Sequence, residues 1–148
     1  LYEALAQRLR DPTAPCSVIF FDLDHFKTLV DTHGHLLGSE IIQEVAARVR
    51  GVVPEPGFGV AYAGDEFVVV LPGATKDAAL AVATTLRERI GTGAYLTAHG
   101  LDVRVSASFG VATFPDDAGD VRSLLGCADR ALFAVKHEGR GGVRAWTG

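Results

Sequence analysis

Two apolar runs separated by a glycine-led acidic turn constrain this chain more than any other stretch. The runs are Phe58–Tyr62 and Phe67–Leu71, and Ala63-Gly64-Asp65-Glu66 lies between them. Glycine adopts positive φ without strain and has no Cβ, so the pattern predicts a β-hairpin whose bend lets a ligand approach the backbone. The adjacent acids Asp65 and Glu66 then lie at its tip. The plainer alternative is a solvated Gly-Asp turn, which is the commoner use of such a dipeptide.

A second acidic cluster follows another apolar run. Cys16–Phe21 is nearly all apolar and leads into Asp22-Leu23-Asp24, which predicts a strand buried on both faces with Asp22 at its C-terminal end. If this strand lies beside the hairpin, Asp22 and Asp65 meet, and two carboxylates with a substrate phosphate suit Mg²⁺ and metal-assisted phosphoryl transfer. The alternative is that Asp22 and Asp24 only end the strand or cap the next helix. We expect the capping role for Asp24 in either case.

The rest of the chain alternates helical and extended patterns. Apolar residues at helical spacing predict helices over residues 1–10, 26–31, 37–49, 77–90 and 121–139. Period-two alternation predicts a second hairpin of residues 95–99 and 103–113 and a closing strand over 143–146. From the first strand onward the order is βααββαββαβ. It predicts an α/β (α+β) sandwich in which helices flank a mixed, mainly antiparallel sheet with a ferredoxin-like βαββαβ core.

Composition bounds the class of protein. The 148 residues fit one compact domain, and 48% apolar with 22% charged residues is typical of a soluble globular chain. A net charge of −4 without clustered Lys and Arg argues against a nucleic-acid surface. No apolar run reaches the length of a membrane span and no secretory signal is visible, so we expect a cytoplasmic domain without membrane contact. Cys16 and Cys127 lack zinc-type spacing, and we expect buried thiols.

Five blocks of the sequence carry a resemblance to a known family, and they are Phe21–Lys27, Gly34-His35, Ala63–Phe67, Val105–Gly110 and Ala128–Lys136. In order and spacing, over nearly the whole chain, they resemble the GGDEF domain, the diguanylate cyclase domain of bacterial signalling proteins. The resemblance implies a fold related to class III nucleotidyl cyclases and polymerase palm domains, with Mg²⁺ held by carboxylates on a strand end and a neighbouring hairpin. Residues 1–10 would then be the end of a linker helix and residues 11–148 the nucleotidyl cyclase domain. The chain has no methionine, even at position 1, which indicates a segment of a longer protein.

The same resemblance implies roles for individual residues. Mg²⁺ or Mn²⁺ would be held by Asp22, the carbonyl of Leu23 and Asp65, and either Asp65 or Glu66 would help to deprotonate the attacking 3′-hydroxyl. The triphosphate would be bound by main-chain amides after the first strand, at His25 and Phe26, and by cationic side chains. These cations are Lys27, Lys136 and Arg140. The base-binding positions would be Val30, His35 and Ser39.

The sequence departs from the family pattern at four places. Ala63 replaces the first glycine of the signature, a small-for-small change. Val30 stands where the family usually has Asn, and Ser39 stands where it usually has Asp, and both usual residues bind guanine. The product-binding inhibitory Arg-x-x-Asp would fall at Pro54–Gly57, which contains neither residue. We therefore expect altered base recognition and no inhibitory site.

Two functions from different classes follow. The first is Mg²⁺-dependent condensation of two purine nucleoside triphosphates, GTP or ATP, into cyclic di-GMP or mixed cyclic AMP-GMP by a homodimer. An N-terminal sensory or regulatory domain would control it. The second is a degenerate GGDEF domain that no longer cyclises and acts as a nucleotide-responsive or protein-interaction module. Retention of every metal and phosphate residue favours the first, and the changed base-reading positions favour the second. A receptor acting through the inhibitory site is disfavoured by its missing Arg and Asp.

Overall fold

The structure is a computed structural model and describes residues 1–11 and 13–148 of the chain. Its helices are α1 (Tyr2–Arg8), α2 (Phe26–His33), α3 (His35–Val52), α4 (Lys76–Gly91) and α5 (Val121–His137), with a 3₁₀ turn η1 (Thr97–His99). Its strands are β1 (Cys16–Leu23), β2 (Phe58–Ala63), β3 (Glu66–Pro72), β4 (Ala107–Phe114) and β5 (Val143–Ala145). No helix among the described residues is long and apolar enough to cross a membrane.

The strands form one sheet in the order β2-β3-β1-β4-β5. Every neighbouring pair is antiparallel except β4 and β5, which α5 joins as a parallel crossover. The first four strands have the order of a ferredoxin-like βαββαβ core. The predicted fold class, a helix-flanked and mainly antiparallel mixed sheet, is therefore confirmed.

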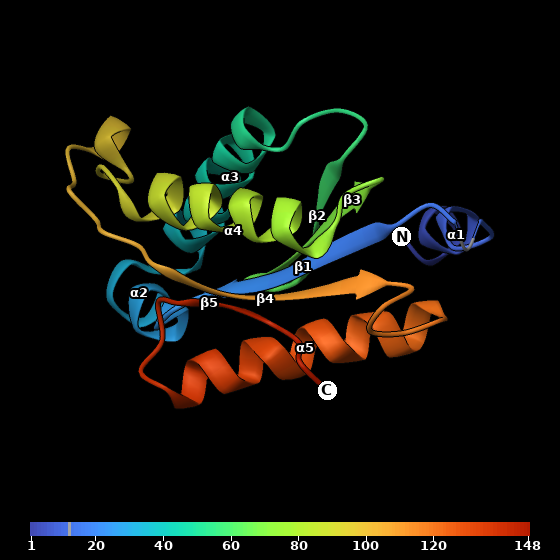
Figure 1. Cartoon of the computed structure of the whole chain (residues 1–148). Helices are drawn as coiled ribbons and strands as arrows, with labels where there is room; N and C mark the ends of the chain where they lie inside the picture. Colours follow the sequence, from blue (N-terminus) through green and yellow to red (C-terminus); the bar gives the residue numbers. More distant parts are fainter. Residues whose placement is uncertain (12) are drawn as a thin grey trace.

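Both faces of the sheet are buried, as the apolar run of β1 predicted. Ile19 and Phe21 face a core completed by α3 and α4, whereas Val18 and Phe20 face a second core beneath α5 and α1. Figure 1 shows this arrangement, with α3 and α4 above the sheet and α5 below it. Strand β1 therefore lies at the centre of the domain, and only its ends are open to chemistry.

Helix α5 approaches β4 at Gly110. A Cβ on this residue would lie 2.1 Å from the Ala128 carbonyl oxygen and 2.4 Å from the Leu132 nitrogen, both in helix backbone. Rigid backbone does not yield to such a contact, so the position requires glycine. This close packing fixes α5, and with it Lys136, relative to β1 and β4.

The second predicted hairpin is wrong. Only Tyr95 and Val103 pair, as an isolated bridge, and β4 begins at Ala107. The chain leaves the extended conformation because Leu96 adopts φ 62° and its amide donates to Glu44 Oε2 at 2.9 Å. The Tyr95 hydroxyl donates to the Ile90 carbonyl at 2.7 Å and fixes the segment against the end of α4. The sheet therefore has one strand fewer than the predicted order.

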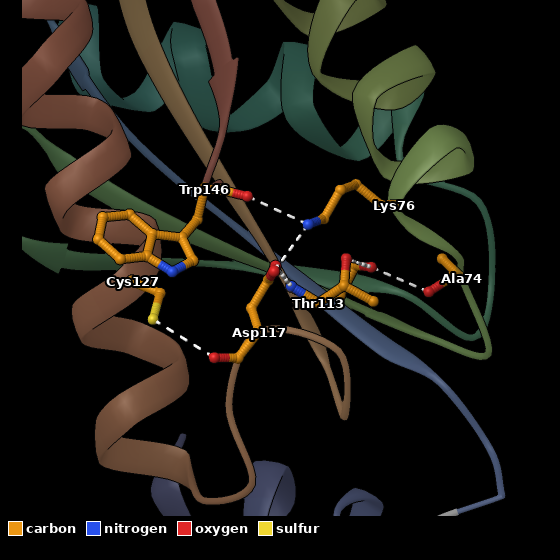
Figure 2. A network of polar contacts seen from close by, with 7 residues as sticks. Ala74, Lys76, Thr113, Asp117, Cys127 and Trp146 are labelled. Carbon is orange, nitrogen blue, oxygen red and sulfur yellow. Dashed lines mark hydrogen bonds and ion pairs between the residues drawn. The ribbon is translucent and has the colours of Figure 1, made fainter. Parts of the chain in front are cut away.

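A polar network closes the end of the sheet where β1 begins. Asp117 Oδ1 accepts a hydrogen bond from Lys76 Nζ at 2.7 Å, and Asp117 Oδ2 accepts one from the Thr113 amide at 2.7 Å (Figure 2). Lys76 Nζ also donates to the Trp146 carbonyl at 3.1 Å, which ties β5 to α4. Both carboxylate oxygens have protein partners, and the network is structural.

Candidate active site

A cavity of about 510 Å³ opens where β1 ends and α2 begins, at the other end of the sheet. It is lined by residues of β1, α2, α3, the β2–β3 turn and α5, which are Leu23, His25, Phe26, Lys27, Val30, Asp31, His35, Asp65 and Lys136. All of these except Asp31 were predicted as site residues. Segments that lie more than a hundred residues apart in sequence thus meet around one cavity.

The predicted β2–β3 hairpin brings the two signature acids to this end of the sheet. Ala63 pairs with Glu66 across a two-residue turn in which Gly64 has φ 57°. Nothing lies within 4 Å of where a Gly64 Cβ would be, so the bend is open to an approaching ligand. Glu66 in turn pairs with Asp22 in the β1–β3 register. The hairpin and the strand end therefore lie side by side, which is the condition on which the expected meeting of Asp22 and Asp65 depended.

Asp22 is a buried carboxylate with one oxygen satisfied and one not. Its Oδ2 lies 2.6 Å from Lys136 Nζ on α5. Its Oδ1 is buried and has no hydrogen-bond partner, the only such side-chain nitrogen or oxygen among residues 1–11 and 13–148. Burial raises the pKa of Asp22 above its ordinary 3.8, Lys136 partly opposes this, and the nearby Asp65 and Asp24 add to the rise. An unpaired buried oxygen costs free energy unless something outside the protein binds it.

The residues present fit a divalent cation. In the described part of the chain no three His, Cys, Asp or Glu side chains are grouped to hold a metal unaided. Asp22 Oδ1 has no protein partner, and the Asp65 carboxylate lies near enough to raise the Asp22 pKa. Leu23 and Asp65 line the same cavity. Carboxylate and carbonyl oxygens are what Mg²⁺ prefers, and it usually completes its shell with water and substrate phosphates. Asp22, Leu23 and Asp65 would hold it.

Glu66 faces a neighbouring cavity of about 270 Å³ that it shares with residues of α1, β1, β2 and α5. Burial raises the pKa of Glu66, and the carboxylates of Asp22, Asp129 and Asp65 raise it further against the opposing charge of Lys136. A carboxyl group with a raised pKa is suited to accept a proton near neutral pH.

The N-terminus of α2 opens into the larger cavity through His25, Phe26 and Lys27. The N-cap residue, His25, has φ 56° and makes no side-chain hydrogen bond to the helix. The first amides of an α-helix lack intrahelical partners and carry its positive dipole end, so they are suited to bind an anion. Lys27 and Lys136 line the same cavity and add positive charge.

The capping role expected for Asp24 is wrong. His25 is the N-cap of α2, and Asp24 instead accepts hydrogen bonds from Ser106 Oγ at 2.7 Å and Ser108 Oγ at 2.6 Å. The Asp24 amide donates to the Ser106 carbonyl at 2.8 Å. The β1–β4 ladder continues past Leu23 and points Asp24 toward β4 rather than along α2, so the side chain is buried.

Four predicted residues do not line the larger cavity, and two acids were missed. Asp22 is buried next to Leu23, which does line it, and Glu66 faces the neighbouring cavity. Ser39 is exposed on α3, and Arg140, at φ 69°, lines a different cavity beyond the end of α5. Asp31 lines the larger cavity, next in sequence to the predicted Val30. Asp129 lines the Glu66 cavity; it lies seven residues before Lys136, which places both on one side of α5. This spacing was the signal that could have identified Asp129.

Comparison with known proteins agrees with this arrangement. The family model described as "Diguanylate cyclase, GGDEF domain" matches residues 1–142. This chain belongs to the GGDEF family. Diguanylate cyclase DosC of Escherichia coli is 36% identical over 132 residues, which cover 89% of this chain and 28% of that protein. An uncharacterized signaling protein of Caulobacter vibrioides is 38% identical over 130 residues, which cover 86% of this chain and 16% of that protein. The domain thus spans well under a third of either relative.

Solved GGDEF structures share the fold of this domain. The GGDEF domain of YfiN from Pseudomonas aeruginosa superposes with a TM-score of 0.93 at 31% identity, covering 99% of this chain and 92% of that one. The active GGEEF domain of a Vibrio cholerae diguanylate cyclase superposes with a TM-score of 0.85 at 26% identity, covering 99% and 90%. The GGDEF domain of DgcB from Caulobacter crescentus, solved in complex with c-di-GMP, gives a TM-score of 0.84 at 28% identity, covering 98% and 85%.

Proposed function

We propose that this GGDEF domain condenses two purine nucleoside triphosphates into a 3′,5′-cyclic dinucleotide in a Mg²⁺- or Mn²⁺-dependent reaction. The observation that carries the proposal is the buried, unpartnered Oδ1 of Asp22 beside a cavity that also holds Asp65 and Lys136. A domain that had lost its chemistry would gain stability by pairing or replacing that oxygen. Retaining it is reasonable where a cation supplies the missing partner.

In each of two condensation steps a ribose 3′-oxygen forms a bond to an α-phosphorus, and the bond from that phosphorus to pyrophosphate breaks. The cation, when bound, polarises the phosphoryl oxygens and lowers the pKa of the attacking hydroxyl. Asp65 or Glu66 accepts the hydroxyl proton, for which the raised pKa of Glu66 is suited. The α2 amides, Lys27 and Lys136 hold the triphosphate and offset the charge that shifts onto pyrophosphate. Arg140 would extend this cationic set from the loop after α5.

Base selectivity is expected to be relaxed. Val30 lines the cavity but offers no hydrogen bond, and the Ser39 hydroxyl donates or accepts, unlike the carboxylate usual there, which only accepts. Guanine then loses its partner at Val30 and keeps at most a single acceptor at Ser39, and adenine is no longer rejected by an acceptor-only group. Use of ATP beside GTP, with cyclic AMP-GMP as a product, follows.

The reaction requires two substrates brought together, so we propose that a homodimer is the catalytic unit, each subunit contributing one bound triphosphate. Residues 1–10 would be the end of a linker helix that joins residues 11–148 to an N-terminal sensory or regulatory domain of a longer cytoplasmic protein. Leu5 of α1 is fully buried against the core beneath α5. A change in the linker would therefore be transmitted to the helix that carries Lys136.

The test is product identification by mass after incubating the dimerised domain with Mg²⁺ and GTP, ATP or both. The proposal expects a cyclic dinucleotide and pyrophosphate, with product from the mixed reaction containing both bases. No product from a verified dimer that binds Mg²⁺·GTP would favour the degenerate-domain alternative. Binding that is equally tight in chelator would contradict the assignment of Asp22 and Asp65.

A further inference from the structure

Arg140 adopts a backbone conformation that is unusual for a residue with a side chain. Its backbone is left-handed at φ 69°, between Gly139 at φ 111° and Gly141 at φ 67°. A non-glycine residue pays a steric cost in this region, and such residues persist where the surroundings fix them. Three hydrogen bonds anchor the loop around Arg140. The Arg140 amide donates to the Val135 carbonyl at 3.0 Å, the Gly141 amide donates to Ser108 Oγ at 2.9 Å, and the Gly142 carbonyl accepts from the Phe109 amide at 3.0 Å.

Ser108 Oγ accepts the hydrogen bond from Gly141 because its own hydroxyl hydrogen is donated to Asp24. A hydroxyl has one hydrogen to donate and lone pairs to accept with, and an ionised carboxylate only accepts. Ser108 Oγ donates to Asp24 Oδ1 at 2.6 Å, which turns its lone pairs toward the Gly141 amide. Ser108 is fully buried and Asp24 is 5% exposed, so water does not compete for these bonds. The direction of the relay, from Gly141 through Ser108 to Asp24, is therefore fixed.

We propose that Asp24 and Ser108 are positioning residues that hold the 139–142 loop, and with it Arg140, against the end of β1. The inference rests on the proposed function, in which Arg140 binds triphosphate. Asp24 lies between Leu23 and His25, so a single carboxylate joins the strand-end half of the triphosphate site to the half after α5. Ser108 does not line the larger cavity, so its effect is expected only through Arg140.

The chain offers a matched control in Ser106. Its hydroxyl donates to Asp24 Oδ2 at 2.7 Å, a bond of nearly the same length, but among the described residues it makes no hydrogen bond to the 139–142 loop. Ser106→Ala therefore removes one hydrogen bond to Asp24 and leaves the anchor of Gly141, whereas Ser108→Ala removes both. A general weakening of the Asp24 cluster would show equally in the two variants.

The experiment measures Mg²⁺-dependent binding of a non-reacting GTP analogue by calorimetry, with amide hydrogen exchange at Gly141 and urea unfolding as parallel readouts. Ser108→Ala is expected to weaken binding about fivefold and to speed Gly141 exchange, and Arg140→Ala to weaken binding about tenfold. Because Ser108 acts through Arg140, the double variant Ser108→Ala/Arg140→Ala should bind no worse than Arg140→Ala. Ser106→Ala should stay within about twofold of the parent.

Additive losses in the double variant, or equal losses in Ser106→Ala and Ser108→Ala, would overturn the relay while leaving the proposed function intact. If Arg140→Ala binds as the parent does, the relay does not serve the triphosphate, and the inference fails alone. If the parent itself does not bind the analogue with Mg²⁺, the proposed function fails and this inference fails with it. Gly141 exchange identifies whether the loop was anchored in each case.

Discussion

The two ends of the central sheet carry lysine–aspartate pairs of nearly identical geometry. Lys76 Nζ lies 2.7 Å from Asp117 Oδ1, and Lys136 Nζ lies 2.6 Å from Asp22 Oδ2. The exposed fractions of the side chains also match, at 29% and 8% for the first pair and 26% and 12% for the second. They differ at the second carboxylate oxygen. Asp117 Oδ2 accepts the Thr113 amide, whereas Asp22 Oδ1 has no partner.

This difference separates a structural ion pair from a ligand site. Lys76 also donates to the Trp146 carbonyl, so that network links α4, β4 and β5 and is complete within the protein (Figure 2). An unpartnered buried acceptor costs about 1–3 kcal/mol. At the Asp22 end no protein group offsets this cost, and the unpartnered oxygen lies beside a cavity lined by Asp65, the N-terminus of α2 and two lysines. The incomplete pair is the reason for proposing that a cation and nucleotide bind at this end of the sheet.

The largest expected contrast is in turnover. Asp22→Asn removes the charge of a proposed metal ligand and should lower turnover about a thousandfold or more, since such a ligand contributes several kcal/mol of transition-state stabilisation. Asp117→Asn makes the same chemical change at the other end and should leave turnover within about threefold. Steady-state rates at saturating Mg²⁺ and GTP measure both. Equal losses of turnover in the two variants would contradict the claim that only the Asp22 end takes part in the reaction.

The contrast should reverse in stability. Asp117→Asn weakens an ion pair whose two oxygens are both used, and should cost about 2–3 kcal/mol in the free energy of unfolding. Asp22→Asn should cost about 1 kcal/mol or less in chelator, because only one oxygen is paired and removing a buried charge offsets part of the loss. Urea unfolding in EDTA provides the values. A larger loss for Asp22→Asn would mean that this pair is the structural one.

A third contrast concerns the base. Val30→Asn with Ser39→Asp should shift the GTP-to-ATP preference in kcat/KM about tenfold or more toward GTP, since each position regains a partner for guanine. Asp117→Asn, far from the cavity, should leave that ratio unchanged. Competition between the two nucleotides, with products separated by mass, reports the ratio. Strict GTP selectivity in the unaltered domain would refute the argument from Val30 and Ser39.

The smallest expected effect is a pH dependence confined to the Asp22 end. Burial raises the folded-state pKa of Asp22 above 3.8, so the folded protein binds this proton more tightly than the unfolded chain. The associated stability is present below pH 3.8 and is lost as the pH rises through the raised pKa. Stability in chelator should therefore fall with pH in this window for the parent relative to Asp22→Asn. A parallel pH dependence in the two proteins would contradict the assigned direction.

Much of the site was predictable because the strand, turn and helix that carry its residues have local sequence patterns. The apolar run of β1 placed Asp22 at a strand end, the glycine-led turn placed Asp65 at a hairpin bend, and helical spacing placed Lys136 near the end of α5. Each pattern depends only on residues within one element and its turn. The expected meeting of Asp22 and Asp65 depended on the pairing of β1 with β3, which the structure shows.

The failures involve contacts between distant segments. Asp24 was predicted to cap α2, but its partners Ser106 and Ser108 lie 82 and 84 residues away, and only the β1–β4 register brings them together. The strand predicted over 95–99 was lost to a side chain on α3, Glu44, that binds the Leu96 amide. The Gly141 amide likewise donates to Ser108 Oγ, 33 residues away. No local periodicity encodes these contacts.

The most direct test of the central claim is calorimetric titration of the domain with a non-reacting GTP analogue, with Mg²⁺ and with chelator. The account predicts that the parent and Asp117→Asn bind the analogue with Mg²⁺ at least about tenfold more tightly than in chelator, and that Asp22→Asn loses this difference. A metal dependence that survives in Asp22→Asn, or that disappears in Asp117→Asn, would show that the unpartnered oxygen of Asp22 is not the ligand site.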